Sequence, residues 1–174
     1  LAHQLAGVGV DVLRFDYYGT GDSAGELHEA TLAGWQDDIE RAIGELRDTA
    51  GAERVGVIGL RLGASLAASL VARKPGIADS LGLWDPVCSG EAYLRELERI
   101  ASQGAGAPAP EHRAAEGTLE IDGFALTPAL AGEIEAIDLR ALVPKLAVPA
   151  RIVVSGSEVA GVHSRTRRGS ASSG

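Results

Sequence analysis

The fold is decided by the stretch at residues 54–73, which reads RVGVIGLRLGASLAASLVAR. Its first part, Arg54–Ile58, is a short apolar run that is typical of a buried parallel strand. Its second part, Leu62–Arg73, predicts a helix, because leucine and valine recur at helical spacing until Lys74-Pro75-Gly76 ends the run. A strand that turns directly into a helix predicts one unit of a parallel α/β sheet.

The segments on either side repeat this alternation. Strands are expected at Val10–Phe15, Ser80–Trp84 and Pro149–Val154, and Thr31 is expected to cap a helix that runs to about Arg47. Strands separated by helices favour a parallel sheet with helices on both faces. Because ligands bind at the carboxyl ends of such strands, we expect the chemistry in the loops that follow them.

A long insertion separates the last two predicted strands. It holds an amphipathic helix at Glu91–Gln103, a flexible low-complexity loop at Gly104–Gly117, and a helix opened by Thr127-Pro128 that runs to about Leu142. This length predicts a mainly helical cap or lid over residues 87–147, called the cap segment below. The expected domains are therefore a core at 1–86, the cap segment, a last core strand within 148–158, and a disordered or aberrant tail at 159–174.

The turn between the strand and the helix, Gly59-Leu60-Arg61-Leu62-Gly63, has the frame of a G-x-S-x-G nucleophile elbow. A sharp turn leaves no room for side chains at Gly59 and Gly63, and the backbone N–H of Leu62 is expected to be an oxyanion donor. The central position calls for Ser, Cys or Asp but holds Arg61, a permanently charged donor without a nucleophilic lone pair. Two interpretations stay open: Arg61 clamps an anion, or it pairs with a neighbouring carboxylate at a dead site.

Four features in this order resemble the α/β-hydrolase superfamily. Residues 16–23, DYYGTGDS, are similar to the D-x-x-G-x-G-x-S loop after strand 4 of serine-aminopeptidase-like and monoacylglycerol-lipase-like members. The elbow frame, the cap segment and the VSGSE end of a strand at 154–158 follow. Arg61, with LWDP at 83–86 and AYLREL at 92–97, resembles hydrolase-like proteins associated with exosortase A and exopolysaccharide gene clusters.

The resemblance implies a partial α/β-hydrolase fold, with strands 4–7 in a parallel sheet, helices on both faces and a helical cap insertion. In that fold three strands would precede Leu1, and strand 8 with a catalytic histidine would follow Glu158. We therefore expect the chain to be a fragment. The resemblance also implies cleavage of ester, amide or peptide bonds through an acyl-enzyme.

The other candidate site residues each have a functional and a structural interpretation. Asp85 and Glu158 are candidate triad acids at the ends of two strands, but Asp85 could equally make a structural turn and Glu158 has no histidine to orient. Asp16 could act as a base or acid, but we expect it to hold the loop of Gly19 and Gly21 through backbone N–H groups. Ser23 is expected to be a turn or helix-cap residue, and Ser65, one turn into the helix after the elbow, a packing or helix-cap residue.

Composition bounds the remaining possibilities. The chain has 174 residues and a net charge of −8; residues 1–160 hold all 24 acidic and 13 of the 16 basic residues, a net charge of −11. This acidic body argues against nucleic-acid binding. The single Cys88 excludes an internal disulfide, which favours a reducing, cytoplasmic location. The sequence contains no membrane span, and its isolated histidines, His3, His28, His112 and His163, favour no metal site, so no cofactor is expected.

Two functions from different classes follow. The first is a hydrolase of the α/β-hydrolase superfamily acting on a small-molecule substrate, with its elbow nucleophile replaced by Arg61. The alternative is a non-catalytic relative that binds an anionic ligand or a partner protein. Loss of a triad nucleophile removes nearly all rate enhancement, which makes serine-triad catalysis unexpected for this chain.

Overall fold

The computed structural model describes residues 1–103, 118–121 and 124–155. In chain order, its elements are α1 (Ala2–Ala6), the 3₁₀ helix η1 (Leu27–Glu29), α2 (Leu32–Ala50), β1 (Gly56–Leu60), α3 (Leu62–Arg73), β2 (Ser80–Trp84), α4 (Gly90–Gln103), β3 (Leu119–Ile121), β4 (Phe124–Leu126), α5 (Pro128–Glu135), α6 (Leu139–Leu142), the 3₁₀ helix η2 (Val143–Lys145) and β5 (Ala150–Val153).

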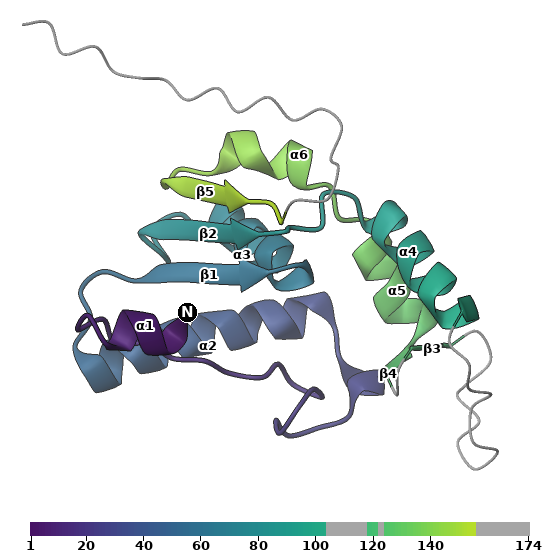
Figure 1. Ribbon diagram of the computed structural model, residues 1–174, viewed down its shortest axis with the longest axis horizontal. Helices are drawn as coiled ribbons and strands as arrows, with labels where there is room; N and C mark the ends of the chain where they lie inside the picture. The colour runs from purple at the N-terminus through teal and green to yellow at the C-terminus, as the bar shows by residue number, and fades with distance from the viewer. Residues whose placement is uncertain (104–117, 122–123, 156–174) are drawn as a thin grey trace, which may run out of the picture.

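The main sheet is parallel, with the strand order β1-β2-β5. Its register places Leu60 beside Trp84 and Trp84 beside Val153, so the three strands end together. The predicted strand at Arg54–Ile58 is displaced by two residues in the structure, because pairing begins where Gly56 meets Ser80 and continues to the elbow. Figure 1 shows all three strands pointing toward α4 and α5.

The strand predicted at Val10–Phe15 is wrong: these residues form no strand. A strand needs backbone bonds to a neighbour, and within the described residues β1 is bonded only to β2. The segment runs beside α2 instead, where Leu13 and Phe15 line a groove with Ala42 and Glu45. The sheet therefore has three of the four predicted strands in the described part of the chain.

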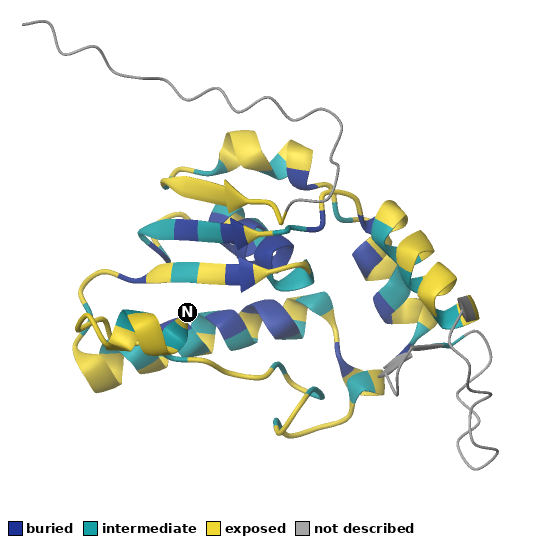
Figure 2. Ribbon diagram, in the orientation of Figure 1, coloured by how far each residue is buried: buried dark blue, intermediate teal, exposed yellow. Residues whose placement is uncertain are grey.

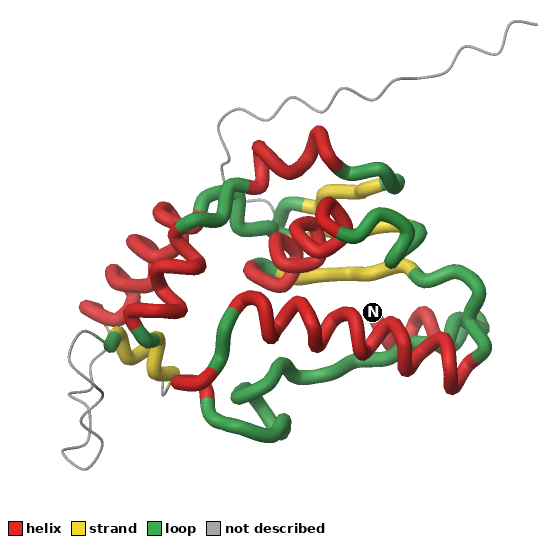
Figure 3. Tube along the Cα trace, turned by 180° about the vertical axis from the view of Figure 1, so that it is seen from behind, coloured by secondary structure: helices red, strands yellow, loops and turns green. Residues whose placement is uncertain are grey.

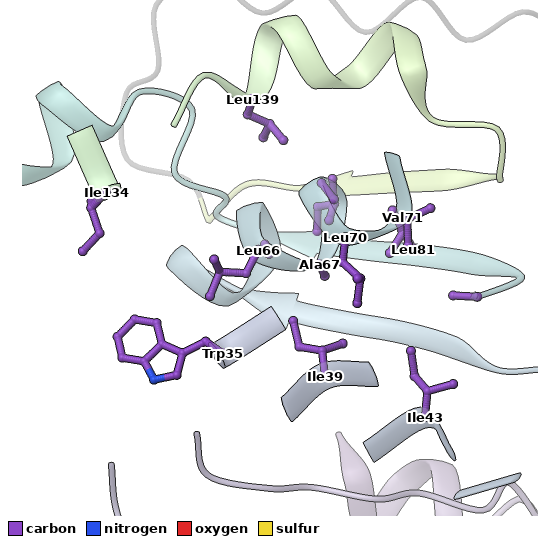
Figure 4. Close-up of a cluster of buried hydrophobic side chains, with 14 of the residues drawn as sticks. Trp35, Ile39, Ile43, Leu66, Ala67, Leu70, Val71, Leu81, Ile134 and Leu139 are labelled. Carbon is purple, nitrogen blue, oxygen red and sulfur yellow. The ribbon is translucent and has the colours of Figure 1, made fainter. Parts of the chain in front are cut away.

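The core lies between the sheet, α3 and α2. Thr31 caps α2 as predicted, with its side chain accepting a hydrogen bond from the Gly34 N–H. The apolar side chains of α2 recur at helical spacing, and Trp35, Ile39 and Ile43 point toward Leu66 and Leu70 of α3 (Figure 4). Each such buried side chain contributes about 1.5–3 kcal/mol, which makes this helix pair the support for the elbow.

The two faces of the sheet are covered unequally. Leu81 and Leu83 of β2 are buried beneath α3, as alternation along a strand requires. On the opposite face the row formed by Leu60, Trp84 and Val153 is 60%, 42% and 51% exposed, and Figure 2 shows this face largely exposed at the strand ends.

Helices α4 and α5 of the cap segment lie beyond the carboxyl ends of the strands in Figures 1 and 3, whereas α6 lies alongside β5. The single helix predicted from Thr127-Pro128 to Leu142 is divided into α5 and α6. The division arises because the chain at 88–90 bonds to the chain at 137–139: the Gly90 N–H donates to Ile137 O and the Leu139 N–H to Cys88 O. Asp138 then caps α6.

The β3–β4 hairpin inside the cap segment was not predicted from the sequence. The loop expected at Gly104–Gly117 lies outside the described residues. Helix α4 packs against α5, and Leu130 and Ile134 of α5 are buried in the same hydrophobic cluster as Leu66 and Leu70. In the described residues, none of the helices has the length and apolarity needed to cross a bilayer.

Candidate functional site

The β1–α3 turn has the conformation that an elbow requires. Arg61 has φ 52° and ψ −121°, a left-handed backbone that is costly for any residue with a Cβ. Gly59 is needed because a Cβ there would lie 2.5 Å from Ala64 Cα and 2.6 Å from Ala64 N. These contacts agree with the steric reason for glycine expected from the sequence, and they present the Arg61 side chain at the carboxyl edge of the sheet.

Backbone bonds hold the elbow in place. The Arg61 N–H donates to Trp84 O at 2.9 Å, and the Arg61 carbonyl accepts from the Ala64 N–H at 3.1 Å and from the Val87 N–H at 3.4 Å. Leu62, the predicted oxyanion donor, is the first residue of α3, where N–H groups have no intrahelical acceptor. The helix N-terminus therefore adds partial positive charge beside the guanidinium.

The Arg61 guanidinium is held by the cap segment. Nη2 lies 3.3 Å from Glu96 Oε2, and the guanidinium carbon lies 5.6 Å from the centre of the Tyr93 ring. The side chains of Arg61 and Glu96 are 49% and 46% exposed, so this ion pair is worth little and is open to competition. Sequence reasoning missed Tyr93 and Glu96 of α4 as site residues. Their spacing of three positions on an amphipathic helix places them on the same side of it, and this spacing could have indicated a shared role.

The pKa of the Tyr93 hydroxyl is raised, chiefly by burial, while the nearby Arg61 charge acts in the opposite direction. The Tyr93 ring is therefore neutral and acts through its face, as a cation–π partner. Together, Glu96 and Tyr93 connect α4 to the elbow.

Asp85, a candidate acid, ties two strand ends together. It has φ 44°, and its carboxylate accepts from the Ser155 N–H at 2.6 Å and from the Ser155 hydroxyl. Trp84 Nε1 also donates to Ser155 Oγ at 3.1 Å. The Ser155 hydrogen bonds, followed by attraction from Arg61, lower the pKa of Asp85. This arrangement matches the structural turn considered from the sequence; the other candidate acid, Glu158, lies outside the described residues.

The loop after residue 15 follows the structural interpretation. Asp16 Oδ2 accepts from the Asp22 N–H at 3.3 Å, as expected for a carboxylate that holds the loop. Gly21 has φ 54°, and a Cβ there would overlap the Asp16 carboxylate. Gly19 has φ 73°, and a Cβ would lie 2.7 Å from Glu26 C. The Ser23 N–H donates to Thr20 O, a turn bond.

Ser65 is a packing residue, as expected: it is buried, and its hydroxyl donates to Val87 O at 2.8 Å. This bond ties α3 to the chain just after β2. Among the described residues, no group of three or more His, Cys, Asp or Glu side chains could hold a metal ion.

Tyr17 connects the loop to the elbow and was missed as a site residue. Its ring packs on those of Phe15 and Trp35, with centroids 5.1 and 5.6 Å away. A Cβ at Gly63 would lie 3.3 Å from the Tyr17 hydroxyl, so the ring lies directly beside the turn. Burial, with a smaller contribution from the Asp38 charge, raises the pKa of Tyr17 to about 12.

We expect Tyr17→Phe to reduce the loss of folding stability that the protein undergoes at high pH. The pKa of Tyr17 is about 12 in the folded protein and 10 in the unfolded chain. The neutral hydroxyl therefore contributes about 2–3 kcal/mol to the free energy of unfolding, which is fully present below pH 10 and lost as the pH rises through 12. Urea unfolding at pH 7 should give similar free energies for both proteins, whereas near pH 12 the variant should be the more stable. An equal alkaline loss in both would contradict the prediction.

The geometry can be compared with known proteins. A family model described as "Serine aminopeptidase, S33" matches residues 1–154. A search of the curated proteins found no match. Among solved structures, Est1E from Butyrivibrio proteoclasticus, with ferulic acid bound, is similar with a TM-score of 0.63 and 21% identity over 87% of this chain. A structure described as LipS and LipT, two metagenome-derived lipolytic enzymes, is similar with a TM-score of 0.60 and 22% identity over 88% of this chain.

These likenesses show a shared α/β-hydrolase fold, as predicted. The chain spans 59% of the Est1E chain and 63% of the lipolytic enzyme.

Proposed function

The chain belongs to the serine aminopeptidase S33 family, and from this premise we propose that it is a non-hydrolysing relative whose Arg61 receives an anionic group at the nucleophile elbow. The observation that carries the proposal is the combination of the elbow backbone, with φ 52° at its centre, and a guanidinium in place of a nucleophile. A strained conformation persists only where the surrounding structure determines it, and here it presents a cation.

The surroundings of Arg61 favour an anion with two oxygens that can accept parallel hydrogen bonds from the planar guanidinium. The guanidinium lies at the N-terminus of α3, a 12-residue helix whose first N–H groups point outward. Its fork of donors matches a carboxylate or phosphate. Glu96 acts as the resident counter-ion, and a ligand carboxylate would take its place without leaving a charge buried, because both side chains are half exposed.

A fluorophosphonate probe tests the absence of serine-hydrolase turnover. We expect no serine of this chain to be labelled, because the elbow holds Arg61 and Ser65 is buried and bonded to Val87 O. Mass spectrometry after incubation, with an active serine esterase as positive control, measures the result. Stoichiometric labelling of any serine would overturn the claim.

To test anion binding, we propose to measure by calorimetry the affinities of hexanoate and of its neutral isostere, hexanamide. Hexanoate should bind and hexanamide should not. Arg61→Gln should weaken hexanoate binding by up to about fivefold, since an ion pair at a half-exposed guanidinium contributes at most about 1 kcal/mol. Glu96→Gln should strengthen it several-fold by removing the competitor. Arg95→Gln, on the outer face of α4 where Arg95 pairs with Glu91, is the matched control.

Ester, amide or peptide cleavage is the second candidate, supported by family membership and by the lipolytic enzyme among the structural neighbours. It would require a nucleophile other than residue 61, and the fluorophosphonate experiment separates it from the first proposal. We also propose that the chain is related to exosortase-associated hydrolases, which is supported by Arg61 and the motifs at 83–86 and 92–97. The proposed division into core and cap segment is supported by the length of the insertion at 87–147, and the proposed cytoplasmic location by the single Cys88.

A further inference from the structure

Strand β1 forms one edge of the main sheet (Figure 1), because within the described residues it pairs only with β2. Successive residues of a strand direct their backbone polar groups to opposite sides. The Arg61 N–H donates to Trp84 O, which lies on the β2 side. The even-numbered residues of β1, which are Gly56, Ile58 and Leu60, therefore direct their N–H and C=O groups to the free edge.

The β1 edge lacks the features that normally keep a sheet edge from pairing with another chain. Such edges are usually protected by charged residues or by proline. The opposite edge, β5, contains Arg151 and follows Pro149 directly, whereas β1, with the sequence GVIGL, has neither kind of residue. Ile58 and Leu60 are 55% and 60% exposed, so the described elements leave this face of the strand open. The β1 edge is therefore available to an added strand.

The charge at the end of β1 determines which kind of strand fits. Arg61 follows Leu60 directly, and the first N–H groups of α3 lie beside it. A strand added parallel to β1 brings its carboxyl end to Arg61, whereas an antiparallel strand brings its amino end. A C-terminal carboxylate is attracted by the guanidinium, and an N-terminal ammonium is repelled by it. The half-exposed ion pair of Arg61 with Glu96 is open to such a carboxylate.

We propose that β1 and Arg61 together bind the C-terminal end of an extended polypeptide, which adds to the sheet as a strand parallel to β1. The polypeptide backbone bonds to the free groups of Ile58 and Leu60, and its terminal carboxylate pairs with Arg61. When its last residue is level with Leu60, the third residue from its end is level with Ile58. Apolar, β-branched side chains at these two positions pack on the open face of the sheet. This inference rests on the anion site proposed at Arg61 and names the class of its ligand.

The probe is the peptide acetyl-Thr-Thr-Val-Thr-Val with a free carboxylate, compared with its C-terminal amide. Titration into ¹⁵N-labelled protein should shift the backbone amide signals of Ile58 and Leu60 and slow their exchange with solvent. The amide of Ile152, on the β5 edge, should stay unchanged. The C-terminal amide should bind up to about fivefold more weakly than the free acid. In Arg61→Gln the two peptides should bind equally.

N-methylation of the peptide tests strand pairing without any change to the protein. In the register given above, the threonine next to the carboxyl end donates its N–H to Ile58 O, whereas the middle valine directs its N–H away from β1. Methylation of this threonine nitrogen should weaken binding by about fivefold or more, because it removes a hydrogen bond. Methylation of the middle valine nitrogen should change the affinity by less than about twofold, because that nitrogen makes no hydrogen bond to β1.

Ile58→Thr and Ile152→Thr are a matched pair, because these isoleucines are 55% and 53% exposed and lie on opposite edge strands. Ile58→Thr should weaken peptide binding by about threefold through lost apolar contact, and Ile152→Thr should not change it.

Equal binding of the two N-methylated peptides would overturn the proposal, even if hexanoate affinity still depends on Arg61. A dimer joined through its β1 edges, detected by sedimentation without peptide, would also overturn it, because a second copy would then occupy the edge. Hexanoate binding that is insensitive to Arg61→Gln would instead overturn the anion site on which the proposal rests.

Discussion

Gly59→Ala is expected to destabilise the protein by about 3 kcal/mol or more, which is the upper end of overpacking costs. The added methyl group would lie 2.5 Å from Ala64 Cα and 2.6 Å from both Ala64 N and Gly63 O. All three are backbone atoms, so no side-chain rotation can relieve the contact. The β1–α3 turn would have to open, and the elbow conformation of Arg61 would be lost with it.

Gly44→Ala is the matched control. Gly44 lies within α2, a Cβ there would meet no heavy atom within 4 Å, and alanine raises helix propensity, so this variant should gain about 1 kcal/mol. Urea unfolding followed by the fluorescence of Trp35 and Trp84 measures both. Equal midpoints for Gly59→Ala and the unmodified chain would show that the turn is not packed as described.

Gly90→Ala is expected to separate α4 from α5, at a cost of about 3 kcal/mol. A Cβ at Gly90 would overlap the Ile134 carbonyl oxygen and lie 2.6 Å from Ile134 C. The same glycine donates its N–H to Ile137 O, so both the packing and the bond would be disturbed. Hydrogen exchange should accelerate in α4 while the amides of β1, β2 and α3 stay protected.

The control for this change is Gly132→Ala on α5, where a Cβ would meet no atom within 4 Å. It should leave exchange in α4 unchanged or slower. Since α4 also carries Glu96 and Tyr93, Gly90→Ala should release the Arg61 guanidinium and strengthen hexanoate binding in the same direction as Glu96→Gln. Slow exchange of α4 in Gly90→Ala would contradict the close packing at Gly90.

The elements that sequence reasoning placed well are those with local causes. Helix α3 and strand β2 have the predicted bounds, and Thr31 and Thr127 cap the predicted helices. Each depends on residues a few positions apart, through helical spacing, N-cap oxygens and turn residues. The elbow was recognisable for the same reason, because Gly59 and Gly63 flank its centre within one turn.

Contacts between distant segments could not be read in this way. The segment Val10–Phe15 is rich in strand-forming residues but has no strand partner in the described residues, so tertiary context overrides its propensity. The continuous helical pattern after Thr127 is interrupted at 136–138 because the chain at 88–90 bonds there. A local sequence pattern does not indicate which backbone groups from distant segments will hydrogen-bond to it.

The sequence by itself determined that this is an α/β chain whose strand-to-helix elbow carries an arginine, because glycine spacing and strand–helix alternation are local properties. The expectation of an α/β-hydrolase fold came from the resemblance of its motifs to that superfamily. Only the tertiary structure decided what Arg61 and Asp85 meet. Glu96 reaches Arg61 across 35 positions and Ser155 reaches Asp85 across 70, through the packing of α4 over the strand ends and the alignment of β5 beside β2. Side-chain partners at such separations follow from the packing of whole elements, which no short stretch of sequence specifies.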